Sequence, residues 1–237
     1  KNEVPAKAVT TSMKAEEEKE VSKDETVYVL AGADGSVQKV IVSDWIKNAL
    51  KEDSIADKSA LSDIENVKGN ETYTLDGSNM TVWDAEGNDI YYQGSIEKEL
   101  PVAMTVSYKL DGKSISADEL AGKSGKVTIR FDYENRQYET VNIDGKNEKI
   151  YVPFGMLTGM LLDSDTFRNV EVSNGKLLND GDRTAVIGIA FPGLQENLGI
   201  DKDKVEIPDY VEITADVTDF ELGMTVTIAT NEIFNEL

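Results

Sequence analysis

Apolar and polar side chains alternate every second residue in several short segments of this chain, and this period constrains the fold most. In the clearest segment, residues 126–133, four apolar side chains alternate with polar ones: Val127, Ile129, Phe131 and Tyr133. A β-strand points successive side chains to opposite faces, so the pattern predicts a strand with one buried face. Residues 210–217 repeat it, which is typical of an antiparallel sheet with water on one side.

Further strands are expected at short intervals, separated by turns rich in Gly, Asp and Asn. They are expected at residues 27–29, 37–42, 80–83, 90–93, 102–108, 140–143, 149–152, 169–172, 184–191 and 224–229. Pairs of these strands flank the turns at residues 32–36, 84–89 and 144–146, which predicts three hairpins. Many short strands with such turns indicate a β-sandwich.

A few short helical segments are expected between the strands. Ser43 can cap a helix over residues 43–50, because Asp44 suits the positive end of a helix and Trp45, Ala49 and Leu50 share one helical face.

Three weaker helical signals follow along the chain. A second short helix or turn is expected over residues 60–66. Ser116 and Glu119 have capping-box spacing, which predicts one helical turn over residues 116–121. Residues 193–199 predict another short helical excursion.

The predicted fold class is mostly β (α+β), in two domains. A small N-terminal α+β domain is expected at residues 24–97, followed by an immunoglobulin-like antiparallel β-sandwich at residues 98–237. Residues 1–23 are polar and lack an apolar stripe, which predicts a flexible leader. The longest apolar run, Phe154–Leu162, is interrupted by glycine and is far shorter than the roughly 20 residues of a membrane span.

Composition narrows the range of functions. The formal net charge is −21, so the chain lacks the basic surface that nucleic-acid binding needs. It contains no Cys and no His, which excludes a Ser–His–Asp triad, a thiol nucleophile and a His-based or Cys-based zinc site. Carboxylates, Tyr, Lys and Ser still permit some enzymes, but we expect a protein without catalytic residues, cofactor or bound metal.

Three aromatic residues are the candidate ligand-binding site. Trp83, Tyr91 and Tyr92 lie on predicted strands and can form a platform on which a sugar ring stacks. Aromatic residues at strand spacing more often pack a core across strands. Because Tyr91 and Tyr92 are adjacent on a strand, they point to opposite faces, and one of them is expected to be more exposed.

Acidic turns offer an alternative calcium site. Carboxylates two residues apart occur at Asp163/Asp165, Asp180/Asp182 and Asp201/Asp203, with a similar group at Asp84, Glu86 and Asp89. Such pairs can share a Ca²⁺ ion, but ordinary turns prefer the same residues. Residues 109–120 also resemble a calcium loop, but Lys109 falls on a ligand position. A strand, an Asp–Gly turn and a capped helical turn explain them better.

A covalent cross-link between side chains is a further possibility in a surface β-domain. Lys126, Lys149 and Asn135 are conceivable members of a Lys–Asn or Lys–Asp isopeptide link assisted by a buried acid. The simpler alternative is that these lysines are solvent-exposed side chains.

Several short strings of the chain carry a family resemblance. These are TVYVL at 26–30, VSDW at 42–45, YYQG at 91–94, LAGKSGKV at 120–127 and IPDYV at 207–211. Most of residues 24–237 thereby resembles the N-terminal exported region of large membrane-anchored proteins of Gram-positive gut bacteria with Leu/Gly heptad-like repeats. Those proteins are loosely similar to the phage-infection-protein-like family. The resemblance implies an extracellular setting and a membrane-tethered parent, and it transfers no site residue.

These observations predict a non-catalytic, extracellular module of a membrane-anchored surface protein that serves protein interaction or architecture. Its expected partner is a cell-envelope or surface protein, and the chain itself is not expected to span a membrane. The alternative is a carbohydrate-binding or carbohydrate-cleaving domain that uses acidic residues with Trp83, Tyr91 and Tyr92. A Ca²⁺-stabilised stalk domain is the third possibility.

Overall fold

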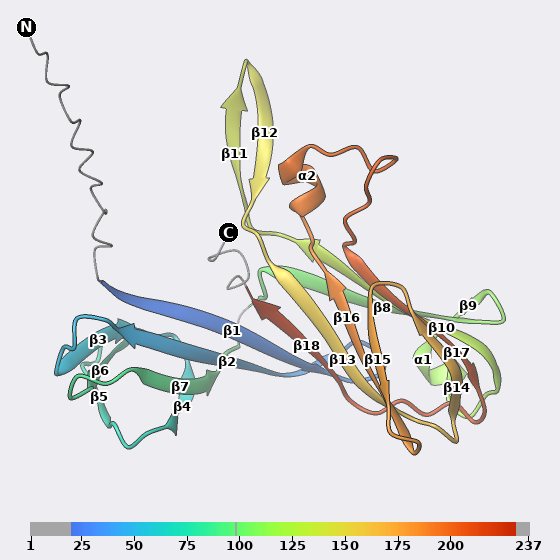
Figure 1. Cartoon of the computed structure of the whole chain (residues 1–237), viewed down its shortest axis with the longest axis horizontal. Helices are drawn as coiled ribbons and strands as arrows, with labels where there is room; N and C mark the ends of the chain where they lie inside the picture. Colours follow the sequence, from blue (N-terminus) through green and yellow to red (C-terminus); the bar gives the residue numbers. More distant parts are fainter. Residues whose placement is uncertain (1–19, 98, 231–237) are drawn as a thin grey trace, which may run out of the picture.

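The computed structural model describes residues 20–97 and 99–230, and this part of the chain is mostly β-structure (Figure 1). Its largest sheet has eight strands, which lie in the order β15 (Gly175–Asn179), β16 (Arg183–Ala190), β13 (Gly155–Asp163), β18 (Thr225–Thr230), β1 (Val21–Ala31), β2 (Val37–Asn48), β7 (Ile90–Ser95) and β4 (Ser62–Lys68). All the strand pairs within these residues are antiparallel, so the predicted mostly-β, sandwich-like class is confirmed.

One half of this sheet packs against a five-stranded sheet to form a large sandwich. That second sheet runs in the order β14 (Phe167–Val172), β17 (Tyr210–Val217), β10 (Gly125–Asn135), β8 (Val102–Leu110) and β9 (Lys113–Ile115). The core between the sheets includes Phe131 and Ile213 on one side and Leu162 and Val186 on the other. Inside it, the Tyr133 hydroxyl lies 2.5 Å from Thr158 Oγ1 and 3.0 Å from Thr227 Oγ1, so this buried phenol is satisfied across the two sheets.

The other half of the eight-stranded sheet packs against a three-stranded sheet to form a small sandwich. The three strands lie in the order β3 (Ser54–Lys58), β6 (Met80–Asp84) and β5 (Tyr73–Leu75). The separate core of this sandwich consists of six buried residues: Ile46, Ile55, Trp83, Ala85, Ile90 and Tyr92.

Strand β1 belongs to both sandwiches. Within the described residues, the first part of the strand, Val21–Glu25, pairs with β2, whereas residues 26–31 pair with β2 on one edge and with β18 on the other. Val21 packs on the small core and Val27 on the large one. The predicted domain boundary, between residues 24–97 and 98–237, stays a prediction. Each range has its own buried core, which favours two domains, but the eight-stranded sheet contains strands of both ranges.

The helix expected over residues 43–50 is wrong. Residues up to Asn48 belong to β2, in which Val40, Val42, Asp44, Ile46 and Asn48 are buried and alternate with more exposed side chains. Hydrogen bonding to β1 and β7 on both edges outweighs the local helix signal. Because two of the buried positions hold the polar residues Asp44 and Asn48, the alternation of buried and exposed side chains does not show as an alternation of apolar and polar residues.

Two more expectations in the N-terminal part are wrong. The short helix or turn expected over residues 60–66 does not form, because residues 62–68 form β4, which packs Ile64 on the small core. The expected hairpin around residues 84–89 does not form, although both of its strands do. Strand β6 pairs with β3 and β5, whereas β7 pairs with β2 and β4, so the 84–89 turn connects two facing sheets. The expected N-terminal α+β domain is therefore all β in its described residues.

The apolar run at Phe154–Leu162 contributes the strand β13, which has no alternating pattern in its sequence. This strand lies in the interior of the sheet between β16 and β18. Met156, Thr158, Met160 and Leu162 are buried on its core face.

Most other local expectations are confirmed. The turns at residues 32–36 and 144–146 close the hairpins β1–β2 and β11 (Tyr138–Ile143)–β12 (Lys146–Tyr151). Helices α1 (Ala117–Leu120) and α2 (Leu194–Leu198) form where expected, and Ser116 and Glu119 make both bonds of the capping box. The leader expected at 1–23 lies mostly outside the described residues, but Val21–Lys23 begin β1.

Candidate functional site

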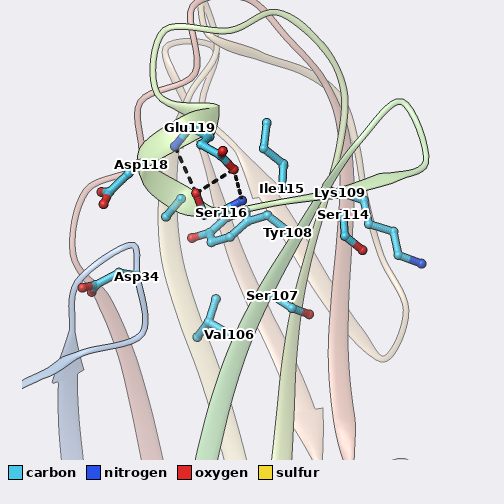
Figure 2. Close-up of a pocket in the computed structure, with 11 residues that line it drawn as sticks. Asp34, Val106, Ser107, Tyr108, Lys109, Ser114, Ile115, Ser116, Asp118 and Glu119 are labelled. Atoms are coloured by element: carbon cyan, nitrogen blue, oxygen red, sulfur yellow. Dashed lines mark hydrogen bonds between the residues drawn. The ribbon is translucent and has the colours of Figure 1, made fainter.

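An open groove of about 540 Å³ lies at the end of the large sandwich, between the 32–36 turn, β8, β9 and α1 (Figure 2). Ser116 and Glu119 on its wall bond to each other: the Ser116 amide and hydroxyl donate to Glu119 Oε2, at 3.3 and 3.0 Å. The Tyr108 hydroxyl donates to the carbonyl of Ala33 at 2.5 Å. These polar groups are thus used in capping the helix and fixing the turn.

The ionisable groups of this groove fit that structural role. The bonds from the Ser116 amide and hydroxyl lower the pKa of Glu119, and the Ser36 hydroxyl and amide lower the pKa of Asp34. Burial raises the pKa of Tyr108. A general acid or base needs a pKa near the working pH, and these shifts move each group away from neutrality.

A second group of ionisable side chains lies at the end of the small core, and we call Lys23, Asp44, Asp57 and Tyr92 the Lys23 cluster. Strands β1, β2 and β7 bring Glu25, Asp44 and Tyr92 into one cross-strand row, because Glu25 pairs with Asp44 and Asp44 with Tyr92. Lys23 lies two residues before Glu25 on the same face of β1. Asp57 reaches the cluster from β3 in the facing sheet.

The contacts in the Lys23 cluster are short. Lys23 Nζ lies 3.0 Å from Asp57 Oδ1 and 3.2 Å from Asp57 Oδ2, and 3.9 Å from Asp44 Oδ2. The Tyr92 hydroxyl donates to Asp57 Oδ2 at 2.5 Å. One ammonium group therefore faces two carboxyl groups, while a phenol holds one of those carboxyl groups in place.

Asp44 is the unusual member of the cluster. It is only 2 % exposed, and its Oδ1 atom has no hydrogen-bond partner. Burial raises the pKa of Asp44 to about 6, against the partial opposition of the Tyr92 hydroxyl and the Lys23 ammonium, and Glu25 adds to the rise. A carboxyl group with such a pKa can both accept and release a proton near neutral pH.

Tyr92 is held in its protonated form. Burial is the main cause that raises its pKa, and the hydrogen bond to Asp57 adds to it. The phenol is therefore a permanent hydrogen-bond donor to Asp57.

The predicted aromatic platform is split between the two faces of the sheet. Trp83 and Tyr92 are fully buried in the small core, with ring centroids 5.2 Å apart, and Tyr73 lies 4.8 Å from Trp83. Tyr91 points to the opposite face, as expected from its place beside Tyr92 in the strand. The three residues thus form no common surface, because two of them build the core.

Tyr91 instead stacks on Trp45, a residue expected in a helix. Their ring centroids are 5.4 Å apart with an angle of 14° between the planes. Lys47 lies 4.5 Å from the centroid of Trp45, and Lys68 lies 4.4 Å from the centroid of Tyr91. The outer face of β2 and β7 therefore carries a half-exposed aromatic pair between two cations.

The acidic turns use their carboxylates to bond their own backbone. Asp163 Oδ1 accepts from the Asp165 amide, Asp180 Oδ1 from the Asp182 amide and Asp201 Oδ1 from the Asp203 amide, at 2.8–3.1 Å. Asp89 accepts from the Trp45 indole and from the Asn48 amide. Within residues 20–97 and 99–230, no group of three or more acidic side chains is placed to hold a metal ion.

The conceivable isopeptide residues do not come together in the expected way. Lys126 and Lys149 are exposed. Asn135 is buried, but its amide donates to the carbonyls of Val152 and Pro192 at 2.7 and 3.1 Å. A lysine beside a carboxyl group and a buried acid occurs instead in the Lys23 cluster. The one signal in the sequence is Asp44, which occupies an inward position of a strand once β2 is recognised.

No family model, no curated protein and no solved structure matches the chain, so the function is inferred from the geometry and from the sequence resemblance. The helices in the described part of the chain are a few residues long, so none of them could cross a bilayer.

Proposed function

We propose that this chain is a non-catalytic extracellular module of a membrane-anchored surface protein and that it serves protein interaction or architecture. The observation that supports the proposal best is the hairpin β11–β12, which projects from the body of the large sandwich (Figure 1). The extracellular, membrane-tethered setting is what the sequence resemblance implies.

The hairpin has a well-defined turn and a fixed base. Asp144 and Gly145 both adopt positive φ, of 51° and 82°, which suits a tight two-residue turn. At the base, Asn197 of α2 accepts from the Tyr151 amide and donates to the Tyr151 carbonyl, both at 2.8 Å. The hairpin is therefore held in one direction by contacts at its base.

One face of the hairpin exposes apolar side chains. Val141, Ile143 and Ile150 share this face by register, and Ile143 is 47 % and Ile150 40 % exposed. An isolated two-stranded hairpin is only marginally stable in water, and apolar side chains grouped on it favour an interface. Beyond its base, both edges of the hairpin can also pair with a strand of a partner, because no third strand of the described residues joins this sheet.

The test is capture of partners from the cell envelope with matched variants. Ile143→Thr with Ile150→Thr removes the two exposed isoleucines of this face and keeps residues that favour a strand. Leu178→Thr, at another exposed apolar residue, is the control. The proposal predicts that proteins enriched by the wild-type chain and by the control are lost with the hairpin variant. Equal capture by all three proteins, or none above an unrelated acidic domain, would overturn it.

Carbohydrate binding is the second candidate, and the stacked pair Trp45–Tyr91 is the observation that favours it. Aromatic rings on a sheet face can stack on sugars, and the acid Asp89 holds the Trp45 indole in place. A glycan array distinguishes the two candidates. Binding that is lost in Trp45→Ala would support a carbohydrate ligand, and an array with no binding would exclude it.

A further inference from the structure

We propose that Lys23 and Asp57 join through an intramolecular isopeptide bond between Lys23 Nζ and Asp57 Cγ, with Asp44 transferring the protons. The bond would link β1 to β3 and would therefore cross-link the two sheets of the small sandwich covalently. This inference is independent of the proposed interaction function.

The two reacting groups already lie in contact. Lys23 Nζ is 3.0 and 3.2 Å from the two oxygens of Asp57, so the amine that would be acylated lies against both oxygens of the carboxyl group. Two reacting groups that the fold holds in contact gain a large effective concentration over the same groups in solution. The side chain of Lys23 is 31 % exposed, which leaves the water formed in the reaction a route to solvent.

Asp44 places a buried acid beside the ion pair of Lys23 and Asp57, and an ordinary surface ion pair has no such acid. Its side chain is almost fully buried, it lies 3.9 Å from Lys23 Nζ, and its Oδ1 atom has no partner. A buried carboxyl oxygen without a hydrogen bond destabilises the fold, and such atoms are concentrated at functional sites. Its raised pKa fits a group that takes a proton from an amine and later releases it.

Tyr92 has a separate part in the reaction. Its hydroxyl donates to Asp57 Oδ2 at 2.5 Å. That oxygen carries the negative charge when the amine adds to Asp57 Cγ, so the phenol is placed to stabilise the tetrahedral intermediate.

The reaction balances without a cofactor. The Lys23 ammonium gives one proton to the Asp44 carboxylate, and the free amine forms a bond to Asp57 Cγ. The bond from Cγ to Oδ1 then breaks, and Oδ1 takes that proton from Asp44 and a second proton from Nζ. One ammonium and one carboxylate become one amide and one water, and Asp44 returns to its starting state.

A second lysine–aspartate pair, which joins β2 to β1, serves as the internal control. Lys47 and Asp24 are also in ion-pair contact between β2 and β1. Asp24 and Lys47 point to the outer face, opposite to the inward row of Asp44 and Ile46. Among the described residues Asp44 is the buried acid, and it lies on the face opposite to this pair, so the proposal predicts no bond there.

The test is mass spectrometry of the purified chain. The intact mass is expected to be lower than the sequence mass by one water. Trypsin is expected to leave the bond after Lys23 uncut, and fragmentation should identify a branched peptide that joins Lys23 to Asp57. No branched peptide should join Lys47 to Asp24. An intact mass equal to the sequence mass, with normal cleavage after Lys23, would overturn the proposal.

Four variants make the result specific. Lys23→Arg keeps the positive charge but cannot form the amide, and Asp57→Ala lacks the carboxyl group, so neither should lose water. Asp44→Asn should remain folded by circular dichroism and fail to cross-link. Asp57→Asn should still form the amide, with loss of ammonia in place of water. Loss of water that persists in Asp57→Ala would place the dehydration elsewhere and contradict the assignment.

Discussion

Replacing Trp83 by alanine tests whether the small sandwich has a core that is energetically separate from the large one. Trp83 is fully buried, and its ring packs between those of Tyr73 and Tyr92 at centroid distances of 4.8 and 5.2 Å. Truncating a buried aromatic residue to alanine costs about 3–5 kcal/mol. Whole domains are stable by only about 5–15 kcal/mol, and the small core has six buried residues, so this loss is expected to open the small sandwich.

Hydrogen exchange read by mass spectrometry or NMR locates the opening along β1. In the part of the chain that the structure describes, Val21–Asp24 pair with β2 beside the small core, whereas residues 26–31 also lie against β18 in the large sandwich. In Trp83→Ala, the first segment is expected to lose protection together with β3 and β6. The second segment, with β13 and β18, is expected to keep it.

Trp83→Phe is the matched control. It keeps an aromatic ring in the core and removes an indole N–H that is buried without a partner, so it should cost much less than alanine. Equal loss of protection on both halves of β1 in Trp83→Ala would refute two separable cores. Unchanged protection throughout would refute the energetic importance of Trp83.

Two further predictions concern pH and packing. In Lys23→Arg, which cannot cross-link, the raised pKa of Asp44 means that the folded state binds its proton more tightly than the unfolded state does. The part of the stability that depends on Asp44 should therefore be greatest below pH about 4 and fall by about 3 kcal/mol up to pH about 6. Adding Asp44→Asn should remove that fall in urea titrations, and a fall of the same size in both proteins would contradict the assignment. Gly188→Ala places a methyl group against Val211 of the facing sheet, well inside van der Waals contact. It should cost about 1–3 kcal/mol in the same titrations, and an unchanged midpoint would refute this close approach of the sheets.

Local chemistry in the sequence predicted a good part of this fold. The Asp144–Gly145 turn, the capping box of Ser116 and Glu119, and the alternation along residues 126–133 all appear as expected. These features depend on neighbours in the chain, so a single sequence is enough to indicate them.

The errors arise where long-range packing decides the structure. Asp44 and Asn48 occupy buried positions of β2, so the strand does not look apolar on alternate residues. Strand β13 lies between two other strands and contains few polar residues, so it has a continuous apolar run instead of an alternating one. Trp83 and Tyr92 lie in different sheets and pack against each other, and the sequence alone does not indicate this contact.

The candidate site was the least predictable part. The Lys23 cluster combines side chains from four strands, and Asp44 becomes a signal only when residues 37–48 are recognised as a strand. The aromatic trio was chosen by residue type, and strand geometry correctly separated Tyr91 from Tyr92. Only the sheet packing reveals that Trp83 and Tyr92 are core residues and that Trp45 is the outward partner of Tyr91.

The projecting hairpin is the part of the molecule on which the proposed function most depends, and photo-cross-linking in living cells tests it most directly. A photoreactive amino acid at position 143 stands on the apolar face of the hairpin, and one at position 178 is similarly exposed elsewhere. We predict a discrete protein adduct from position 143 and none from position 178. The same adducts from both positions, or none from position 143 on the surface of cells that make the protein, would contradict an interaction module that works through this hairpin.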